Sequence, residues 1–249
     1  MDSTRPIRIA AIADLHVGQQ PNGTLVGLFA GLDREADVLC LCGDLTDRGR
    51  PEEAIALVEE LAGVSIPIVA VLGNHDHESE AADEVAAILT DRGIHLLDGE
   101  AVVVSGVGFA GVKGFGGGFG RYTIGSFGER LLKEFVRETL DEVLKLESAL
   151  RSLTTRTKIA LMHFSPIAET LVGEPEQLYP FLGSSRFLPV VEAHGASVVF
   201  HGHAHFGTLE GVTPGGIEVY NVARPILEKL GRRVHIWSGR APERREASD

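Results

Sequence analysis

Short apolar runs alternate with amphipathic stretches through the first third of the chain. Three of these runs end at polar turns: Ile7–Ala13, Val38–Cys42 and Ile66–Leu72. Such runs are typical of strands buried on both faces. Helical periodicity predicts helices between and after them, over Leu25–Glu35, Pro51–Leu61 and Glu78–Arg92. This alternation predicts parallel strands joined by crossover helices.

The pattern changes after Gly93, where apolar runs follow one another with turn residues between them. Three of them predict antiparallel hairpins: Ile94–Leu97, Ala101–Val104 and Val107–Val112. Apolar residues at helical spacing predict a long helix over Phe127–Leu150. Further strands are predicted at Lys158–Met162, Val198–Phe200, Gly207–Gly211, Glu218–Val222 and Val234–Trp237.

No linker divides the chain, and its polar clusters are spread from residue 14 to residue 205. We therefore expect a single domain over residues 1–238 and a solvated polar tail over 239–249. The predicted fold is of the α/β class. It consists of two mixed β-sheets packed as a sandwich and flanked by helices, with the first half mostly parallel.

Five polar clusters stand where predicted strands run out into loops. They are Asp14–His16, Gly43–Gly49, Gly73–Asp76, Met162–Phe164 and Gly202–His205. Carboxylate, imidazole and carboxamide groups are costly to bury unless something pairs with them. The carboxyl ends of strands are also where open α/β sheets place their sites. A pair of divalent cations accounts for so many such groups.

The donor types narrow the choice of cation. Asp44 offers two oxygens and can bridge two metals, Asn74 offers a carbonyl oxygen, and the histidines offer ring nitrogens. A mixed oxygen and nitrogen set suits Mn, Fe or Zn better than Mg or Ca, which prefer oxygen. The sequence does not choose among Mn, Fe and Zn.

These clusters read in order as Asp-x-His, Gly-Asp-x-x-Asp-Arg, Gly-Asn-His-Asp, a single His and Gly-His-x-His. Together they resemble the calcineurin-like metallophosphoesterases, over residues 7 to about 222. The resemblance implies that the first metal is bound by Asp14, His16 and His205. It implies that the second is bound by Asn74, His163 and His203, and that Asp44 bridges the two.

The resemblance also implies a reaction, hydrolysis of a phosphoester by a metal-bridging hydroxide that attacks phosphorus in line. His75 matches the catalytic histidine that is not a ligand, and Asp47 matches the carboxylate that orients it. Arg48 matches a phosphate-contacting arginine of the protein-phosphatase branch. Because the chain resembles small bacterial members, a phosphodiesterase on small substrates such as cyclic nucleotides is favoured. The alternatives are a phosphomonoesterase acting on nucleotides or phosphoproteins, a nuclease, and a non-catalytic metal-binding scaffold.

Composition restricts the partners. The formal net charge of −12 argues against binding a nucleic-acid backbone or an anionic membrane, and leaves a small phosphoester as the expected substrate. Cys40 and Cys42 fall within one predicted strand and are expected to be core residues. No stretch reaches the length of a membrane span, so a cytoplasmic protein is expected. The oligomeric state stays open.

Two segments are candidates for substrate recognition. Gly114–Gly120 carries two phenylalanines and predicts either a mobile loop near a ligand or a tight connection. Ser165–Pro189 has several prolines and follows His163, as the wall of a binding cleft would. The possible substrate contacts in or next to these segments are Arg121, Tyr122, Tyr179 and Arg186.

Three other features have competing interpretations. His201 precedes the last cluster and is expected to support a ligand by a hydrogen bond rather than to act directly. His77 is either near the substrate or a solvated residue at a helix start. Gly106–Gly111 matches the dinucleotide-binding fingerprint, but the glycines after it cannot open the helix that the fingerprint needs.

Overall fold

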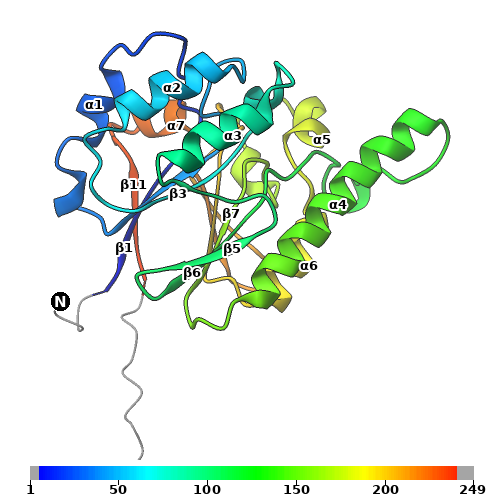
Figure 1. Cartoon of the computed structure of the whole chain (residues 1–249). Coiled ribbons are helices and arrows are strands. Elements are labelled where there is room, and N and C mark those ends of the chain that lie inside the picture. Colours follow the sequence, from blue (N-terminus) through cyan, green and yellow to red (C-terminus); the bar gives the residue numbers. More distant parts are fainter. Residues whose placement is uncertain (1–5, 240–249) are drawn as a thin grey trace, which may run out of the picture.

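The computed structural model describes residues 6–239 and contains two β-sheets with helices outside them (Figure 1). The first sheet has the order β11-β1-β2-β3-β4 and the second the order β5-β6-β7-β8-β10-β9. The strands of the first sheet are β1 (Arg8–Ile12), β2 (Val38–Cys42), β3 (Ile68–Val71), β4 (His95–Leu96) and β11 (His235–Ser238). Those of the second are β5 (Ala101–Val104), β6 (Val107–Gly111), β7 (Lys158–Leu161), β8 (Val198–His201), β9 (Glu210–Val212) and β10 (Glu218–Asn221).

Both sheets are mixed, and parallel pairs form the centre of each. β1, β2 and β3 are parallel neighbours, as the alternating pattern predicts, and so are β6, β7, β8 and β10. Antiparallel strands stand at the edges: β11, β5 and β9. The second half of the chain is therefore as parallel as the first, because helices or long loops also connect its central strands.

The helices lie on the outer faces of the sheets. They are α1 (Thr24–Phe29), α2 (Pro51–Glu60), α3 (Ala82–Asp91), α4 (Arg130–Ser152), α5 (Tyr179–Leu182), α6 (Leu188–Ala193) and α7 (Arg224–Lys229). Single 3-10 turns are found at Leu32–Arg34, His75–His77, Gly120–Tyr122, Glu169–Leu171, Glu176–Leu178 and Ser185–Phe187. In Figure 1, α1, α2 and α3 lie over the first sheet, and α4 runs past the second.

One apolar cluster joins the two sheets. It includes Ile9 and Leu39 from the first sheet and Phe109, Leu161 and Phe200 from the second, all of them fully buried. A second cluster fills the space between the second sheet and helices α4 and α6. Cys40 and Cys42 are free and buried in β2, as expected of core residues. This arrangement is the predicted sandwich flanked by helices.

Three predicted elements differ from the structure. The predicted helix Leu25–Glu35 is interrupted at Gly31, whose φ of 72° is left-handed, so that α1 is short and a 3-10 turn follows. The predicted helix Glu78–Arg92 begins at Ala82, because Glu80 also has a positive φ of 57°. β4 is a parallel neighbour of β3 rather than part of a hairpin. α3 carries the chain back along the sheet before β4 begins, which makes a parallel pairing possible.

The remaining predicted elements are present in the described part of the chain, two of them with shifted bounds. The strand predicted at Gly207–Gly211 is β9 at Glu210–Val212, and the helix predicted at Phe127–Leu150 is α4 at Arg130–Ser152. β5 and β6 form the expected antiparallel hairpin, and Gly106–Gly111 contributes to β6 instead of opening a helix. None of the described helices is long and apolar enough to cross a membrane. The predicted polar tail falls almost entirely on residues 240–249, which lie outside the described residues.

Candidate metal centre

The five polar clusters meet at the carboxyl ends of β1, β2, β3, β7 and β8. One group of side-chain donors consists of Asp14, His16 and His205, and its atoms lie within 4.8 Å of one another. A second group with the same spacing consists of Asp44, His163 and His203. The structure thus brings together, in two groups, side chains that are up to 191 positions apart in sequence.

Asp44 connects the two groups. Its Oδ1 lies 3.3 Å from His163 Nε2, and its Oδ2 lies 3.9 Å from His16 Nε2. Asn74 joins the second group, because its Oδ1 lies 3.1 Å from His163 Nε2. All seven residues to which the resemblance assigns a metal are therefore neighbours, in the two sets that it implies.

Backbone strain is concentrated at these residues. The described residues include six non-glycine residues with positive φ, and four of them belong to the two groups: Asp14, His16, Asp44 and His203. The left-handed conformation costs a side-chain-bearing residue about 1–2 kcal/mol. Such strain persists where the surrounding structure enforces it and is frequent at functional sites.

Glycines next to the groups let the backbone approach the donor atoms. A Cβ on Gly202 would lie 2.5 Å from Asp14 Oδ2, and one on Gly43 would lie 2.6 Å from Cγ of the His163 ring. A Cβ on Gly73 would collide with both the carboxylate and the amide of Asp44. A side chain at the glycine that opens each of these motifs would therefore collide with a donor residue. Gly43 is favoured for a second reason, because its φ of 86° is left-handed.

Backbone carbonyls fix which nitrogen each imidazole presents. Nδ1 of His163 lies 3.0 Å from the carbonyl oxygen of Cys42, and Nε2 of His203 lies 3.1 Å from that of Phe181. Since a carbonyl only accepts, these nitrogens carry hydrogens, and the opposite nitrogens are the ones left to bind a cation. Histidines that bind metals commonly donate their second nitrogen in this way.

The charges of the two groups compensate one another in the absence of a cation. Burial disfavours the imidazolium of His163, but the charge and hydrogen bond of Asp44 outweigh it and raise the pKa of His163 to about 9. Burial opposes ionisation of Asp44 as well, and His163 nevertheless holds the pKa of Asp44 below its usual range. Burial lowers the pKa of His203 to about 4, so this ring is neutral near pH 7.

Two observations show that these residues fit divalent cations. Nε2 of His16 is buried and has no hydrogen-bond partner among the residues that the structure describes, although it faces Asp44. A buried nitrogen without a partner is costly, and a cation removes that cost. In addition, carboxylate, carboxamide and neutral imidazole donors are those that Mn, Fe and Zn accept.

His75 adjoins the two groups, and its ring forms a third set of donor atoms within 4.8 Å with His16 and Asp44. Its Nδ1 lies 2.7 Å from the backbone carbonyl oxygen of Asp47, and its Nε2 lies 4.0 Å from Asp44 Oδ2. This differs from the sequence-based expectation, which assigned the orienting contact to the carboxylate of Asp47. That carboxylate is half-exposed and instead lies 3.7 Å from Nε of Arg48. Arg48 is also 3.5 Å from Glu78.

The sequence analysis assigned no role to Asp76, which is fully buried behind the site. Its Oδ1 accepts hydrogen bonds from the amide and hydroxyl of Thr46, at 2.8 and 2.6 Å. Its Oδ2 accepts one from the amide of Gly73 at 2.8 Å. Asp76 therefore ties the loop after β2 to the loop after β3. Its position directly after Asn74 and His75 was the available signal.

The other histidines singled out in the sequence lie outside the two groups. His201 is fully buried, and its ring nitrogens lie 2.8 Å from the Thr170 hydroxyl and 2.8 Å from the Gly202 carbonyl. It is thus a hydrogen-bonded core residue behind the last cluster, and its contacts are to Thr170 and Gly202 rather than to the metal donor expected from the sequence. His77 is exposed to solvent.

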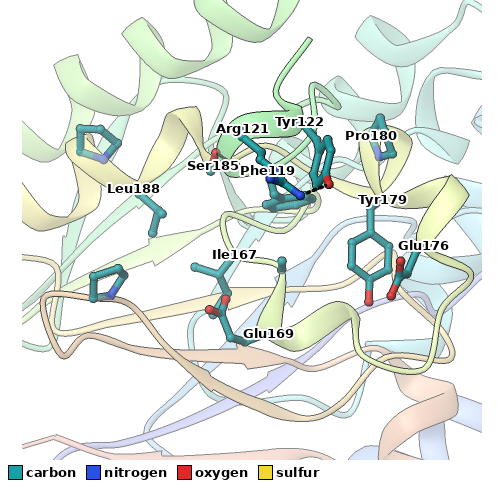
Figure 2. Close-up of a pocket in the computed structure, with 15 residues that line it drawn as sticks. Phe119, Arg121, Tyr122, Ile167, Glu169, Glu176, Tyr179, Pro180, Ser185 and Leu188 are labelled. Atoms are coloured by element: carbon teal, nitrogen blue, oxygen red, sulfur yellow. Dashed lines mark hydrogen bonds between the residues drawn. The ribbon is translucent and has the colours of Figure 1, made fainter.

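The two candidate recognition segments line two cavities. A cavity of about 400 Å³ adjoins Asn74 and His203, and a separate one of about 720 Å³ lies beyond α5. Figure 2 shows the larger cavity, with Phe119, Tyr122 and Tyr179 around it and Glu169 and Glu176 at its edge. None of the seven donor residues lines this larger cavity.

The predicted substrate contacts are divided accordingly. Arg121, Tyr122 and Tyr179 line the larger cavity and not the one beside the donors. Arg186 lines neither, and its guanidinium donates to the carbonyl of Ile124 at 2.9 Å. The glycine segment is packed: Gly117 and Gly118 are buried and donate to the carbonyls of Pro180 and Gly183. The interpretation as a tight connection is therefore favoured over a mobile loop.

Comparison with known proteins agrees with this geometry. Residues 7–207 match the calcineurin-like phosphoesterases, so the chain belongs to this family. The fold is similar to that of the phosphopantetheinyl hydrolase PptH from Mycobacterium tuberculosis, with a TM-score of 0.66 at 14% identity over 98% of this chain and 99% of that one. It is also similar to TT1561 of Thermus thermophilus, with a TM-score of 0.54 at 20% identity over 95% and 99%. No curated protein sequence matches the chain.

Family membership defines the class of activity. The protein is a metal-dependent phosphoester hydrolase, and the family implies a centre of two divalent metals, which the clusters of aspartate and histidine fit. The similar structures are under 25% identical to this chain, so they support the fold and not a particular substrate.

Proposed function

We propose that the protein is a phosphodiesterase acting on small phosphodiesters such as cyclic nucleotides. The observation that carries the proposal is the place of Asp44 between two groups of donors. We assign the first cation to Asp14, His16 and His205 and the second to Asn74, His163 and His203, with Asp44 shared. The metals are Mn, Fe or Zn.

The protein's own residues would hold and orient the reactants. When bound, two neighbouring cations polarise phosphoryl oxygens and make a water acidic enough to serve as a nucleophile near neutral pH. His75 is well placed to act as the general acid, because its Nδ1 is tied to the Asp47 carbonyl and its Nε2 faces the site. Protonated at Nε2, it would give that proton to the departing ester oxygen.

The charge around the site favours a diester over a monoester. Two arginines lie near the donor groups: Arg48 shares Glu78 with His75, and Arg224 lines the same cavity as His16. Each is already paired with a glutamate, at 3.5 Å to Glu78 and 2.7 Å to Glu228. A phosphomonoester carries a second negative charge, which would need an additional unpaired cation. The resemblance gives Arg48 a phosphate contact, and we propose that Arg48 makes it from the exposed side of the site only when it leaves Glu78.

The expected partner is a small phosphoester rather than a nucleic acid, because the chain has a formal charge of −12. We also propose a cytoplasmic location. Its support is that both cysteines are unpaired, as is usual in a reducing compartment.

The proposal is tested by a substrate panel with added manganese: bis-p-nitrophenyl phosphate, p-nitrophenyl phosphate and cyclic nucleotides. We expect kcat/KM for the diester and for a cyclic nucleotide to exceed that for the monoester. A preference for the monoester would instead establish a phosphomonoesterase. If the metal-loaded protein cleaves none of the three, the proposed function is wrong.

A further inference from the structure

The cavity of about 400 Å³ beside the donor groups has an unusual lining for a site that handles a charged ester. Two of its residues, Asn74 and His203, are donors that we assign to the second cation. The other side chains are apolar, apart from one glycine: Phe115, Gly116, Phe135, Phe164, Leu178, Phe181 and Leu182. None of these offers a side-chain hydrogen bond to a ligand.

Aromatic rings form a continuous surface that begins at a metal donor. The ring of Phe164 lies 4.3 Å from that of His203, and Phe115 lies 5.8 Å from Phe164. Phe135, from α4, lies 5.0 Å from Phe115 and 6.4 Å from Phe181. These spacings are those of interacting aromatic pairs, so the wall is a packed unit rather than a set of separate side chains.

The outer part of this wall is exposed to water. Phe181 is 59% exposed and Leu178 is 46% exposed. Single exposed apolar residues are common, but here two of them stand together at the mouth of a cavity that leads to the donor groups. Covering them with an apolar group would remove this area from water, at about 25 cal/mol per Å².

The nearest cation does not change the apolar character of the cavity. Lys113 Nζ lies 4.8 Å from the centre of the Phe115 ring and 5.6 Å from that of Phe164. It is not among the residues that line the cavity, and Glu138 lies 3.8 Å from it. Lys113 therefore stabilises the rings by a cation–π contact and leaves the cavity without a charged side chain of its own.

We infer that this cavity binds an apolar ester group of the substrate, an alkyl chain or an aromatic ring attached to the phosphate. The inference rests on the phosphodiesterase function proposed above and names the substrate class of that site. The aromatic rings line the same cavity as the donors Asn74 and His203. A phosphate held at these two donors therefore places one of its ester substituents along the aromatic wall. The group is recognised by contact and not by hydrogen bonds, so a nucleobase placed there stacks without being distinguished as adenine or guanine.

Gly116 keeps this cavity open. A Cβ at this position would lie 2.5 Å from the Pro180 carbonyl oxygen and 3.2 Å from the Phe135 ring. The glycine thus allows the loop after β6 to pass close to α5 while the rings stay apart. An alanine there would have to push Phe135 or the backbone of α5 into the cavity.

The test measures binding of two non-hydrolysable phosphonates to the metal-loaded protein by calorimetry. Methylphosphonate and hexylphosphonate carry the same charged head and differ in methylene groups, each worth up to about fourfold in affinity when it leaves water. We expect hexylphosphonate to bind at least about tenfold more tightly. Phe181→Ala should reduce this ratio by weakening the binding of hexylphosphonate, because the backbone carbonyl that holds His203 remains. Gly116→Ala should reduce the ratio as well.

Phe127→Ala is the matched control, because Phe127 is 69% exposed and does not line the cavity. It should keep the wild-type ratio. Equal affinities for the two phosphonates, or a ratio that Phe181→Ala leaves unchanged, would overturn the inference. Binding of hexylphosphonate with the same affinity after removal of the metals would support the cavity and contradict the metal centre, whereas binding of neither phosphonate would contradict both proposals.

Discussion

At the scale of single residues, a hydrogen bond to the main chain orients His75, the proposed general acid. The backbone carbonyl of Asp47 fixes the hydrogen on Nδ1 and turns Nε2 towards Asp44, and a carboxylate oxygen of Glu78 lies farther away, 3.8 Å from Nδ1. The carboxylate of Asp47 lies 3.7 Å from Nε of Arg48. The orienting role therefore belongs to the main chain.

Two substitutions separate these roles. His75→Ala should lower kcat by about 10²- to 10⁴-fold, the usual contribution of a general acid, while both metals remain bound. Asp47→Asn should cost far less, because the carbonyl that orients His75 remains. Turnover and metal content are measured for both variants. If Asp47→Asn were as damaging as His75→Ala, the carboxylate would be the orienting group after all.

His235 gives the protein a pH dependence that is independent of the metal centre. It is 6% exposed, its ring lies 4.1 Å from that of Tyr220, and its nitrogens have no hydrogen-bond partner in the part of the chain that the structure describes. Burial lowers the pKa of His235 to about 4, with Arg232 adding to the effect and Glu218 opposing it.

The unfolded chain binds a proton at this residue below about pH 6.5 and the folded protein does not until about pH 4. Stability is therefore lost as the pH falls from 6.5 to 4. His235→Phe keeps an aromatic ring beside Tyr220. It should remove about one proton from the difference in proton binding between the unfolded and folded states, so that the free energy of unfolding varies less with pH. Urea unfolding of both proteins at several pH values is the measurement, and identical slopes would contradict the account.

At the scale of elements, the loops that follow the strands carry the site, and their glycines determine its geometry. A Cβ at Gly73 would collide with Asp44, the residue shared by the two groups. Asp76 then ties that same loop to Thr46. These contacts explain why polar side chains on separate loops keep a common geometry.

Gly73→Ala should therefore weaken metal binding by about 10- to 100-fold, as is typical when a residue that supports a ligand is changed. Gly63→Ala is the matched control, because an added Cβ there meets nothing within 4 Å. Metal titration of the two variants gives the comparison. Equal affinities would show that Asp44 can move without consequence.

The sequence predicted these elements unevenly. β1, β2 and β3 follow from their apolar runs, and the donor residues follow from motifs placed directly after strands. The pairing of β4 did not follow, because two residues carry too little pattern to distinguish a hairpin from a parallel edge. The helix breaks at Gly31 and Glu80 each depend on one positive backbone angle, and the residue type at these positions does not reveal that angle. The carbonyl contact of His75 and the division of the two recognition segments between two cavities depend on tertiary packing.

At the scale of the whole molecule, the centre lies between the two sheets, with donors from β1, β2 and β3 on one side and from β7 and β8 on the other. Among the described residues, two buried carboxylates lie there with five histidines: His16, His75, His163, His203 and His205. Without cations, the structure balances these groups by ion pairs such as the one at 2.9 Å between His205 and Asp14.

Metal binding should therefore stabilise the whole fold. Ligands that bind the native state shift the unfolding equilibrium by mass action. Removal of metal with a chelator should lower the Tm, and readdition of manganese should restore it. Asp44→Asn should reduce the shift, because both groups share that residue. A Tm that does not respond to metal would contradict a structural connection between the two sheets through the centre.

The central claim is that two cations share Asp44. Anomalous diffraction at the metal absorption edges, from crystals of the manganese-loaded protein, measures this directly. The account predicts two peaks on either side of Asp44, one beside Asp14, His16 and His205 and one beside Asn74, His163 and His203. A single peak, or two peaks of which neither lies within bonding distance of Asp44, would contradict it.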